Sequence, residues 1–211
     1  GFNLAVVNDS PSGAPTAVLA AGTEDTAYGL SAETLLQGFS DVDGDALSVS
    51  NLSANHGALV DNANGTWTFT PAANYNGPVA LTYDVVDGHG GSVAASLGFN
   101  LSAVNDAPTG APTAVLAAGT EDTAYQFTAA SLLQGFSDVD GDTLSASSLG
   151  ANHGALVDNP DGTWTFTPAA DYNGPVSLTY NVIDGRGGSI AATQGFNLAV
   201  VNDSPSGAPT A

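Results

Sequence analysis

The stretch Val79-Ala80-Leu81-Thr82-Tyr83-Asp84-Val85-Val86-Asp87-Gly88 decides the fold of this chain. Its bulky apolar residues Val79, Leu81, Tyr83 and Val85 recur at every second position, which is the side-chain period of a β-strand. The pattern therefore predicts a strand with one buried face. The Asp-Gly pair at its end is a common turn signal, so we expect the strand to stop there.

The same alternation appears on both sides of this stretch. Thr66-Trp67-Thr68-Phe69-Thr70 places Trp67 and Phe69 on one face and threonines on the other, and Ala46–Leu52 also alternates. Phe99 and Leu101 share a face in a later segment. These residues are the predicted core, and they favour sheets over helices.

Turn signals separate the segments, and one short helical turn is expected between them. Ser31–Leu36 suits a single turn of helix capped by Ser31. About seven short strands at this spacing are typical of a two-sheet sandwich, so the predicted fold class is all-β. The turn signals within the first copy are Asn64-Gly65, Asn76-Gly77-Pro78 and Asp87-Gly88-His89-Gly90-Gly91.

The sequence is a tandem repeat. Gly1-Phe2-Asn3-Leu4 recurs at Gly98 and at Gly195, both steps are 97 residues long, and the last 17 residues copy the first 17. A period of this length fits a small self-sufficient domain rather than a solenoid unit. The predicted plan is 1–9 as the end of a preceding repeat and its linker, 10–106 as repeat 1, 107–203 as repeat 2, and 204–211 as the start of another repeat.

The predicted linkers share the pattern Val-Asn-Asp-Ser/Ala-Pro, followed by small residues and proline. Proline ends strand pairing because it lacks an N–H group. The linker at Asn105–Thr113 contains Pro108, Gly110 and Pro112, and its composition predicts a hinge. The three copies of the pattern are Val7–Pro11, Val104–Pro108 and Val201–Pro205.

Charge excludes two classes of partner. The chain has 21 acidic residues, one basic residue and a formal net charge of −20. It cannot neutralise phosphates, so we expect no nucleic acid and no anionic membrane surface as partners. It has no cysteine, which removes disulfides and thiolate chemistry, and no apolar run of transmembrane length, and we expect no signal peptide within these residues.

The acidic residues gather in a few places, and this suggests calcium. Carboxylates two residues apart around a glycine offer the oxygen ligands that calcium prefers, whereas transition metals favour His or Cys. The alternative is that the Asp-Gly loops are ordinary solvated turns. The candidate calcium ligands are Asn8, Asp9, Glu24, Asp41, Asp43, Asp45, Asp87, Asn105, Asp106, Glu121, Asp138, Asp140, Asp142, Asp184, Asn202 and Asp203.

These motifs resemble, in content and in order, the bacterial cadherin-like repeats of large RTX-type surface adhesins exported by type I secretion. Thr23-Glu24-Asp25 is similar to the cadherin Pro-Glu-Asn motif, and Phe39–Asp43 to the Ala-Thr-Asp-x-Asp segment. Tyr83–Gly88 is similar to the strand that ends in Asp-Gly, and Asn105-Asp106 to the core of the Asp-x-Asn-Asp-Asn linker. The resemblance covers both full repeats.

The chain departs from the cadherin pattern in two respects. The first Asp of the linker motif is replaced by Val6, Ala103 and Val200, and its last Asn by Ser or Ala. The Asp-Arg-Glu motif has no clear counterpart, although Ala73–Asn76 stands near its place. The junction between repeats is therefore expected to hold fewer ions than a full cadherin junction.

The resemblance implies two tandem Greek-key, cadherin/immunoglobulin-like β-sandwiches and a calcium-rigidified spacer. It implies an extracellular location on a bacterial cell surface, with neighbouring repeats of the same polypeptide as partners. Other domains would then bind the carbohydrate or cell-surface ligand. The one complete junction would use Glu24, Asn105, Asp106, Asp138, Asp140 and Asp184.

Catalysis is not expected. His56 and His153 have no neighbouring nucleophile elbow, and a 97-residue repeat has no insertion large enough for a glycosidase cleft. The alternative function is a cadherin-like polysaccharide-binding module. Trp67 and Trp164 are expected in the core, whereas Tyr75 and Tyr172 lie in turns and could stack on sugar rings.

Overall fold

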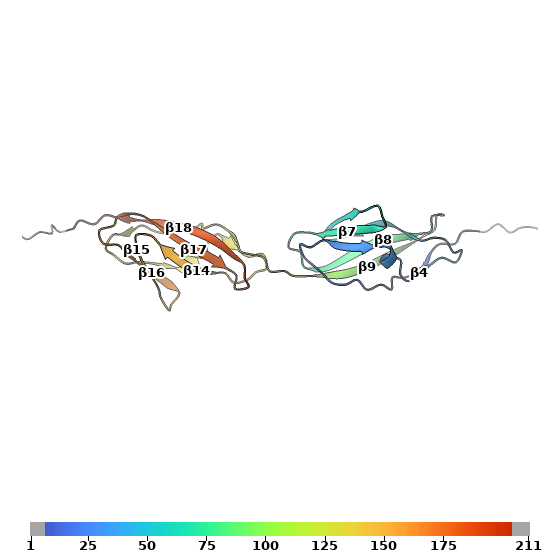
Figure 1. Cartoon of the computed structure of the whole chain (residues 1–211), viewed down its shortest axis with the longest axis horizontal. Coiled ribbons are helices and arrows are strands. Elements are labelled where there is room, and N and C mark those ends of the chain that lie inside the picture. Colours follow the sequence, from blue (N-terminus) through green and yellow to red (C-terminus); the bar gives the residue numbers. More distant parts are fainter. Residues whose placement is uncertain (1–6, 204–211) are drawn as a thin grey trace, which may run out of the picture. The chain divides into compact units, whose positions relative to one another are not determined.

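The structure is a computed structural model that describes residues 7–203. The described part of the chain divides into two compact units, and the change of unit falls between Val104 and Asn105. Figure 1 shows the first unit in blue to green and the second in yellow to red. Because the units repeat the same sequence pattern, the same elements recur in each.

One layer of the first unit is a four-stranded sheet built on the stretch that begins at Val79. Its long central hairpin is antiparallel, whereas β2 joins its edge in parallel through Gly22 and Leu101. The strand order is β2 (Gly22–Thr23), β9 (Ser92–Ser102), β8 (Gly77–Val86) and β5 (Ser48–Ala54).

The other layer is a three-stranded antiparallel sheet, in the order β3 (Tyr28–Ser31), β7 (Thr66–Pro71) and β6 (Gly57–Asp61). A separate two-stranded pair joins β1 (Ser12–Gly13) to β4 (Phe39–Ser40). The chain enters β6 at a glycine because a Cβ at Gly57 would lie 2.5 Å from the Phe69 ring.

The second unit repeats this arrangement. Its four-stranded sheet has the order β11 (Gly119–Thr120), β18 (Ser189–Ala199), β17 (Gly174–Ile183) and β14 (Ser145–Ala151). Its three-stranded sheet has the order β12 (Tyr125–Thr128), β16 (Thr163–Pro168) and β15 (Gly154–Asp158). The short pair joins β10 (Thr109–Gly110) to β13 (Phe136–Ser137).

The core lies between the two sheets of each unit, and the alternation in the sequence identified it. Val79, Leu81, Tyr83 and Val85 are all buried, as are Phe69, Phe99 and Leu101. Trp67 is half-buried and packs against this cluster. The prediction of an all-β sandwich with these residues inside is therefore confirmed.

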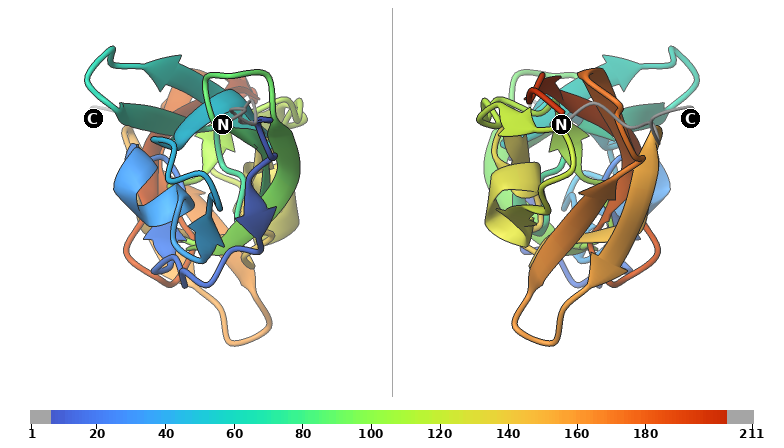
Figure 2. Two further views of the ribbon diagram at one scale, coloured as in Figure 1. Left: turned by 90° about the vertical axis from the view of Figure 1, so that its right-hand side faces the viewer. Right: turned by 90° about the vertical axis from the view of Figure 1, so that its left-hand side faces the viewer.

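The predicted helical turn is also present. α1 (Ala32–Leu35) begins after Ser31, whose hydroxyl accepts a hydrogen bond from the Thr34 N–H at 3.2 Å. The Tyr83 hydroxyl donates to the Leu35 carbonyl at 2.8 Å, which fastens α1 to the core. Its counterpart α2 (Ala129–Leu133) is capped by Thr128. Figure 2 shows each short helix beside the strands of its own unit, α1 in blue and α2 in yellow.

The segment Asn105–Thr113, predicted to be a hinge, is bonded to the second unit instead. β10 pairs with β13, and the Thr113 N–H donates to the Gln134 carbonyl at 2.9 Å. Gly110 has a φ of 122°, and a Cβ there would clash with the Gly135 carbonyl oxygen. The prolines and glycines of this segment allow the close pairing of β10 with β13. Composition alone therefore wrongly indicated a hinge.

No helix in residues 7–203 is long and apolar enough to cross a membrane.

Candidate metal centre

Each unit carries acidic residues at both ends of its long hairpin. In the first unit, the turn Asp87–Gly91 closes one end of the β8–β9 hairpin. At the other end Gly77 pairs with Leu101, and β2 leads there into Glu24. A strand rises about 3.3 Å per residue, so the two ends are roughly 30 Å apart. We call them the loop end and the glutamate end.

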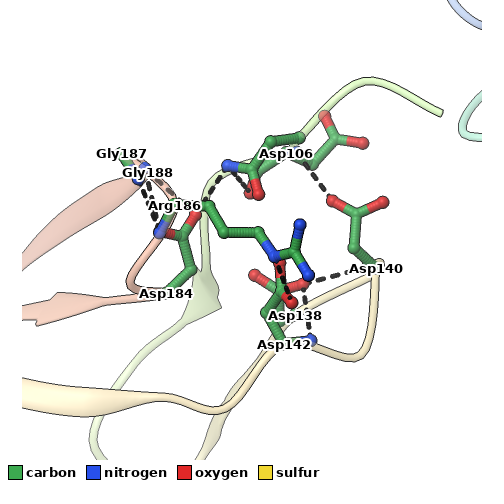
Figure 3. A network of polar contacts seen from close by, with 9 residues as sticks. Asp106, Asp138, Asp140, Asp142, Asp184, Arg186, Gly187 and Gly188 are labelled. Atoms are coloured by element: carbon green, nitrogen blue, oxygen red, sulfur yellow. Dashed lines mark hydrogen bonds and ion pairs between the residues drawn. The ribbon is translucent and has the colours of Figure 1, made fainter.

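The Asp-x-Asp-Gly-Asp segment forms a compact loop at the loop end. Asp41 Oδ1 accepts hydrogen bonds from the backbone N–H groups of Asp43 and Asp45, at 2.8 and 3.4 Å. These bonds turn the chain so that Asp41, Asp43 and Asp45 each place a carboxylate oxygen within 4.8 Å of the others. The second unit repeats the loop with Asp138, Asp140 and Asp142 (Figure 3).

The Asn-Asp segment that precedes each unit is held in this loop. The Asp9 N–H donates to Asp43 Oδ2 at 2.7 Å, and the Asp106 N–H donates to Asp140 Oδ2 at 2.7 Å. The second bond is drawn in Figure 3. The loop therefore fixes the chain at the point where it enters the sandwich.

The aspartate at the end of the long strand completes the site. Asp87 is 3% exposed, accepts from the N–H groups of His89 and Gly91, and also accepts from Asn8 Nδ2 at 2.8 Å. The Asn8 hydrogen bond is the largest cause that lowers the pKa of Asp87, and Asn105 does the same for the pKa of Asp184. Both aspartates are thus held as anions.

A glycine is required beside this aspartate. A Cβ at Gly188 would clash with Asp184 Oδ2, and the Gly188 N–H donates to both oxygens of that carboxylate at 3.0 Å. Figure 3 shows the close approach of Gly187 and Gly188 to Asp184. The turn Asp184–Gly188 is therefore shaped around a carboxylate.

The loop end fits calcium. Within the described residues, the buried Oδ2 atoms of Asp41, Asp138 and Asp142 accept no hydrogen bond. A buried polar atom without a partner costs about 1–3 kcal/mol, and a cation would remove that cost. The atoms at the loop end that could ligate a metal are carboxylate, amide and carbonyl oxygens. Oxygen ligands suit Ca²⁺ better than a transition metal.

The glutamate end is built differently. Glu24 is 1% exposed and accepts from the Val104 N–H at 2.6 Å and from Asn76 Nδ2 at 3.3 Å. Glu121 makes the equivalent bonds to Val201 and Asn173, at 2.6 and 2.9 Å. This glutamate clamps the chain where it leaves the sandwich, just as the loop holds it where it enters.

Two residues at this end were missed as candidate ligands. Asp122 and Asp171 lie with the predicted Asp203 so that one carboxylate oxygen of each is within 4.8 Å of the others. Desolvation first, and then the charges of Asp171, Asp122 and Glu121, raise the pKa of Asp203. The segment Ala73–Asn76, noted near the place of the missing cadherin motif, is the signal that could have identified Asp171, since its Asn74 aligns with that residue.

The structure brings most of the predicted ligands together within each unit. At the loop end lie Asn8, Asp9, Asp41, Asp43, Asp45 and Asp87 in the first unit, and Asn105, Asp106, Asp138, Asp140, Asp142 and Asp184 in the second. Of the six residues predicted for the junction, Glu24 alone belongs to the first unit. Asn202 donates to the Asp203 carbonyl, and both are exposed.

A stacked pair of one exposed and one half-buried aromatic ring is present in both units. The His56 and Tyr75 rings stack with centroids 3.9 Å apart and planes 4° apart, and His153 and Tyr172 stack at 4.0 Å and 5°. Both histidines are exposed. No local sequence pattern predicts this pairing, because the two residues are 19 positions apart in the chain.

Comparisons with known proteins agree with this architecture. The family profile for the cadherin-like domain matches residues 7–102 and 104–199. A sequence comparison with curated proteins found no match.

Solved structures with a similar fold include protocadherin gamma B2 extracellular cadherin domains 1–5, with a TM-score of 0.52, 16% identity, and coverage of 94% of this chain and 42% of that one. The match to human protocadherin-24 EC1–2 has a TM-score of 0.50 and 13% identity, and it covers 92% of this chain and 100% of that one. The endo-fucoidan hydrolase MfFcnA4 has a TM-score of 0.38 and 25% identity. The match covers 96% of this chain and only 30% of the hydrolase.

Proposed function

Because the chain belongs to the cadherin-like domain family, we propose that it is a calcium-stiffened extender segment of a bacterial cell-surface adhesin. Domains of this family are usually non-catalytic, typically extracellular and generally bind Ca²⁺. The segment would project a distal ligand-binding domain and so support cell adhesion. Its direct partners would be neighbouring repeats of the same polypeptide.

The observation that carries the proposal is the state of the carboxylates at the loop end. The turn hydrogen bonds use Oδ1 of Asp41 and of Asp138, while the buried Oδ2 of each accepts no hydrogen bond within the described residues. In an ordinary solvated turn, this Oδ2 atom would be accessible to water. Calcium would be held by the Asp-x-Asp-Gly-Asp carboxylates with the Asn-Asp segment, and it would supply the positive charge that a chain of net charge −20 lacks.

The chain between the sandwiches is held at two places. The Val104 N–H is bonded to Glu24 in the first unit, and the Asp106 N–H is bonded to Asp140 in the second. Only Asn105 lies between these two anchors, and its side chain donates to Asp184 at 2.7 Å. Calcium bound at the loop end would hold the second anchor more firmly, which is how we propose that it stiffens the extender.

Small-angle X-ray scattering of the whole chain tests the proposal. We expect a longer and better-defined maximum dimension in millimolar CaCl₂ than in EGTA. MgCl₂ should substitute poorly, because Mg²⁺ demands near-octahedral geometry and keeps its waters. Profiles that superimpose in calcium and chelator, while calcium still raises the melting temperature, would contradict stiffening and leave calcium as a fold stabiliser.

A second candidate function, polysaccharide binding, rests on the stacked pairs His56–Tyr75 and His153–Tyr172. The Tyr75 hydroxyl donates to the Pro78 carbonyl at 2.9 Å, and its ring packs against the core, so its role is partly structural. The exposed His56 borders a surface hollow that is also lined by Asn55, Pro78 and Gly98. The flat His56 ring offers a stacking face for a sugar ring, and the amide and carbonyl groups beside it offer hydrogen bonds.

Retention on an insoluble neutral polysaccharide measures this activity directly. If the stacked His–Tyr pairs bind polysaccharide, the whole chain should be retained, and the double variant His56→Ala/His153→Ala should not be retained. A matched control is His89→Ala, because His89 lies outside both stacked pairs. Equal retention of all three proteins, or no retention of the wild type, would rule out the stacked His–Tyr pairs as a glycan site.

A further inference from the structure

The single basic residue of the chain, Arg186, lies beside the candidate calcium loop of the second unit. Its Nε is 2.7 Å from Asp142 Oδ1, and this contact forms an ion pair. The Asp142 side chain is only 15% exposed, whereas that of Arg186 is 68% exposed. Figure 3 shows Arg186 reaching from the turn after Asp184 to the carboxylates of the loop.

The first unit has a histidine at the same place. His89 Nε2 is 3.5 Å from Asp45 Oδ1, and its side chain is 64% exposed. The loop has the same Asp-Val-Asp-Gly-Asp sequence in the two units, and the same backbone N–H groups donate to the side chain of its first aspartate. The side chain that faces the third aspartate, however, differs between the two loops.

This exchange changes the charge of the site. Arginine stays charged at every physiological pH, whereas histidine is charged only when it is protonated. A guanidinium on Asp142 cancels part of the repulsion among Asp138, Asp140 and Asp142. The same positive charge repels a divalent cation that approaches these carboxylates.

We propose that Arg186 is a built-in counter-ion that partly replaces calcium in the second unit. It holds the loop Asp138–Asp142 in its folded shape without metal and lowers the calcium affinity of that loop relative to Asp41–Asp45. The inference rests on the proposed calcium function for the affinity difference, but the metal-free ordering of the loop does not depend on it. A tandem array with both kinds of loop would stiffen in steps as calcium rises.

The test is an NMR titration of the ¹⁵N-labelled whole chain with CaCl₂. The amide signals of Gly44 and Gly141 report the two loops separately, because each glycine lies inside its own Asp-x-Asp-Gly-Asp segment. In the wild type, Gly44 should reach its midpoint at about tenfold lower calcium than Gly141. Coulomb's law gives an effect of about this size for a unit charge and a divalent cation roughly 6 Å apart in water.

Two variants isolate the guanidinium. Arg186→Gln removes the charge but retains the backbone N–H that donates to Asp184 Oδ1, so the turn itself should persist. It should bring the Gly141 midpoint down to that of Gly44. The reciprocal His89→Arg should raise the Gly44 midpoint by a similar factor. Equal midpoints in the wild type, or a Gly141 midpoint that Arg186→Gln does not move, would overturn the proposed affinity difference.

Hydrogen exchange in EGTA tests the metal-free part separately. The amides of the second loop should be more protected than those of the first, and Arg186→Gln should remove the difference. If this protection is found while neither glycine responds to calcium, the counter-ion role stands and the calcium function fails. If protection is equal in wild type and variant, the counter-ion role is wrong whatever calcium does.

Discussion

The two ends of each sandwich carry similar acidic residues but differ in whether every buried carboxylate oxygen has a protein donor. At the glutamate end, Glu121 is 2% exposed, and protein N–H groups fill both of its oxygens through Val201 and Asn173. At the loop end, Asp138 and Asp142 bury oxygens that accept no hydrogen bond within residues 7–203. A carboxylate whose two oxygens both have protein donors acts as a clamp for the backbone, whereas a buried carboxylate oxygen without a donor is a site where a cation would be favourable.

The clamp should matter with or without metal. Glu121→Ala leaves the Val201 N–H and the Asn173 amide without their acceptor, at about 1–3 kcal/mol for each group that stays buried. We expect a loss of about 3 kcal/mol in the unfolding free energy of the second unit, in calcium and in EGTA alike. Urea unfolding followed by Trp164 fluorescence in a Trp67→Phe background measures it.

Glu121→Gln is the matched control for this clamp, because it keeps one acceptor oxygen at nearly the same size, and it should cost clearly less. If the cost of Glu121→Ala were confined to calcium-containing buffer, this end would be a metal site rather than a clamp.

The loop should matter mainly when calcium is present. Asp138→Asn with Asp140→Asn keeps acceptor oxygens for the turn but removes two charges. At a hundredfold excess over Kd, ligand binding stabilises by about 2.7 kcal/mol, and the double variant should lose most of this amount. In EGTA it should unfold like the wild type or slightly later, because repulsion is relieved. The same Trp164 signal follows the change.

Asp41→Asn with Asp43→Asn is the control in the other unit, and it should leave the Trp164 transition unchanged. A similar loss from this control would mean that the two loops do not act on their own units. An equal loss for the Asp138 and Asp140 variant in EGTA would mean that the turn needs these charges without any ion.

Acid should destabilise the loop end by protonating Asp184, the aspartate that follows the long strand. The loss of stability should be smaller than the losses predicted for the Glu121 and Asp138/Asp140 variants. The pKa of Asp184 is lowered from its ordinary value of 3.8, first by the Asn105 hydrogen bond. A lowered folded-state pKa adds stability that is fully present above about pH 4 and is lost as the pH falls through the folded-state value. Calcium-depleted protein unfolded by urea between pH 5 and pH 2.5 should show this slope.

Asn105→Ala removes the principal cause of this shift and should flatten the slope for the second unit. Asn8→Ala should do so for the first, because Asn8 is the main cause of the lowered pKa of Asp87. A slope that neither variant changes would show that other carboxylates carry the acid sensitivity.

Much of the fold could be predicted from the sequence, because it depends on local patterns. The alternation from Val79 to Val85 gave the central strand and its buried face, and Ser31 marked the start of α1. The family match now supports the cadherin-like assignment that the order of acidic motifs indicated. The bacterial adhesin origin remains part of the proposal.

Features that depend on contacts between distant residues could not be predicted. The proline-containing segment Asn105–Thr113 looked like a hinge, but its pairing with β13 is visible only in three dimensions. The stacking of His56 on Tyr75 and the approach of Arg186 to Asp142 are also distant contacts. Likewise, the sequence placed Glu24 among calcium ligands, while the structure also gives it a backbone partner in Val104.

The central claim is that the carboxylates of the loop end bind calcium in the folded protein. Thermal unfolding of the whole chain in millimolar CaCl₂, in MgCl₂ and in EGTA tests it most directly. Extracellular modules often bind calcium with Kd values of about 0.1–1 mM, so the midpoint should fall in EGTA and return as calcium is added through this range. Magnesium should restore little of it. Unfolding curves that coincide in calcium and EGTA would contradict the claim.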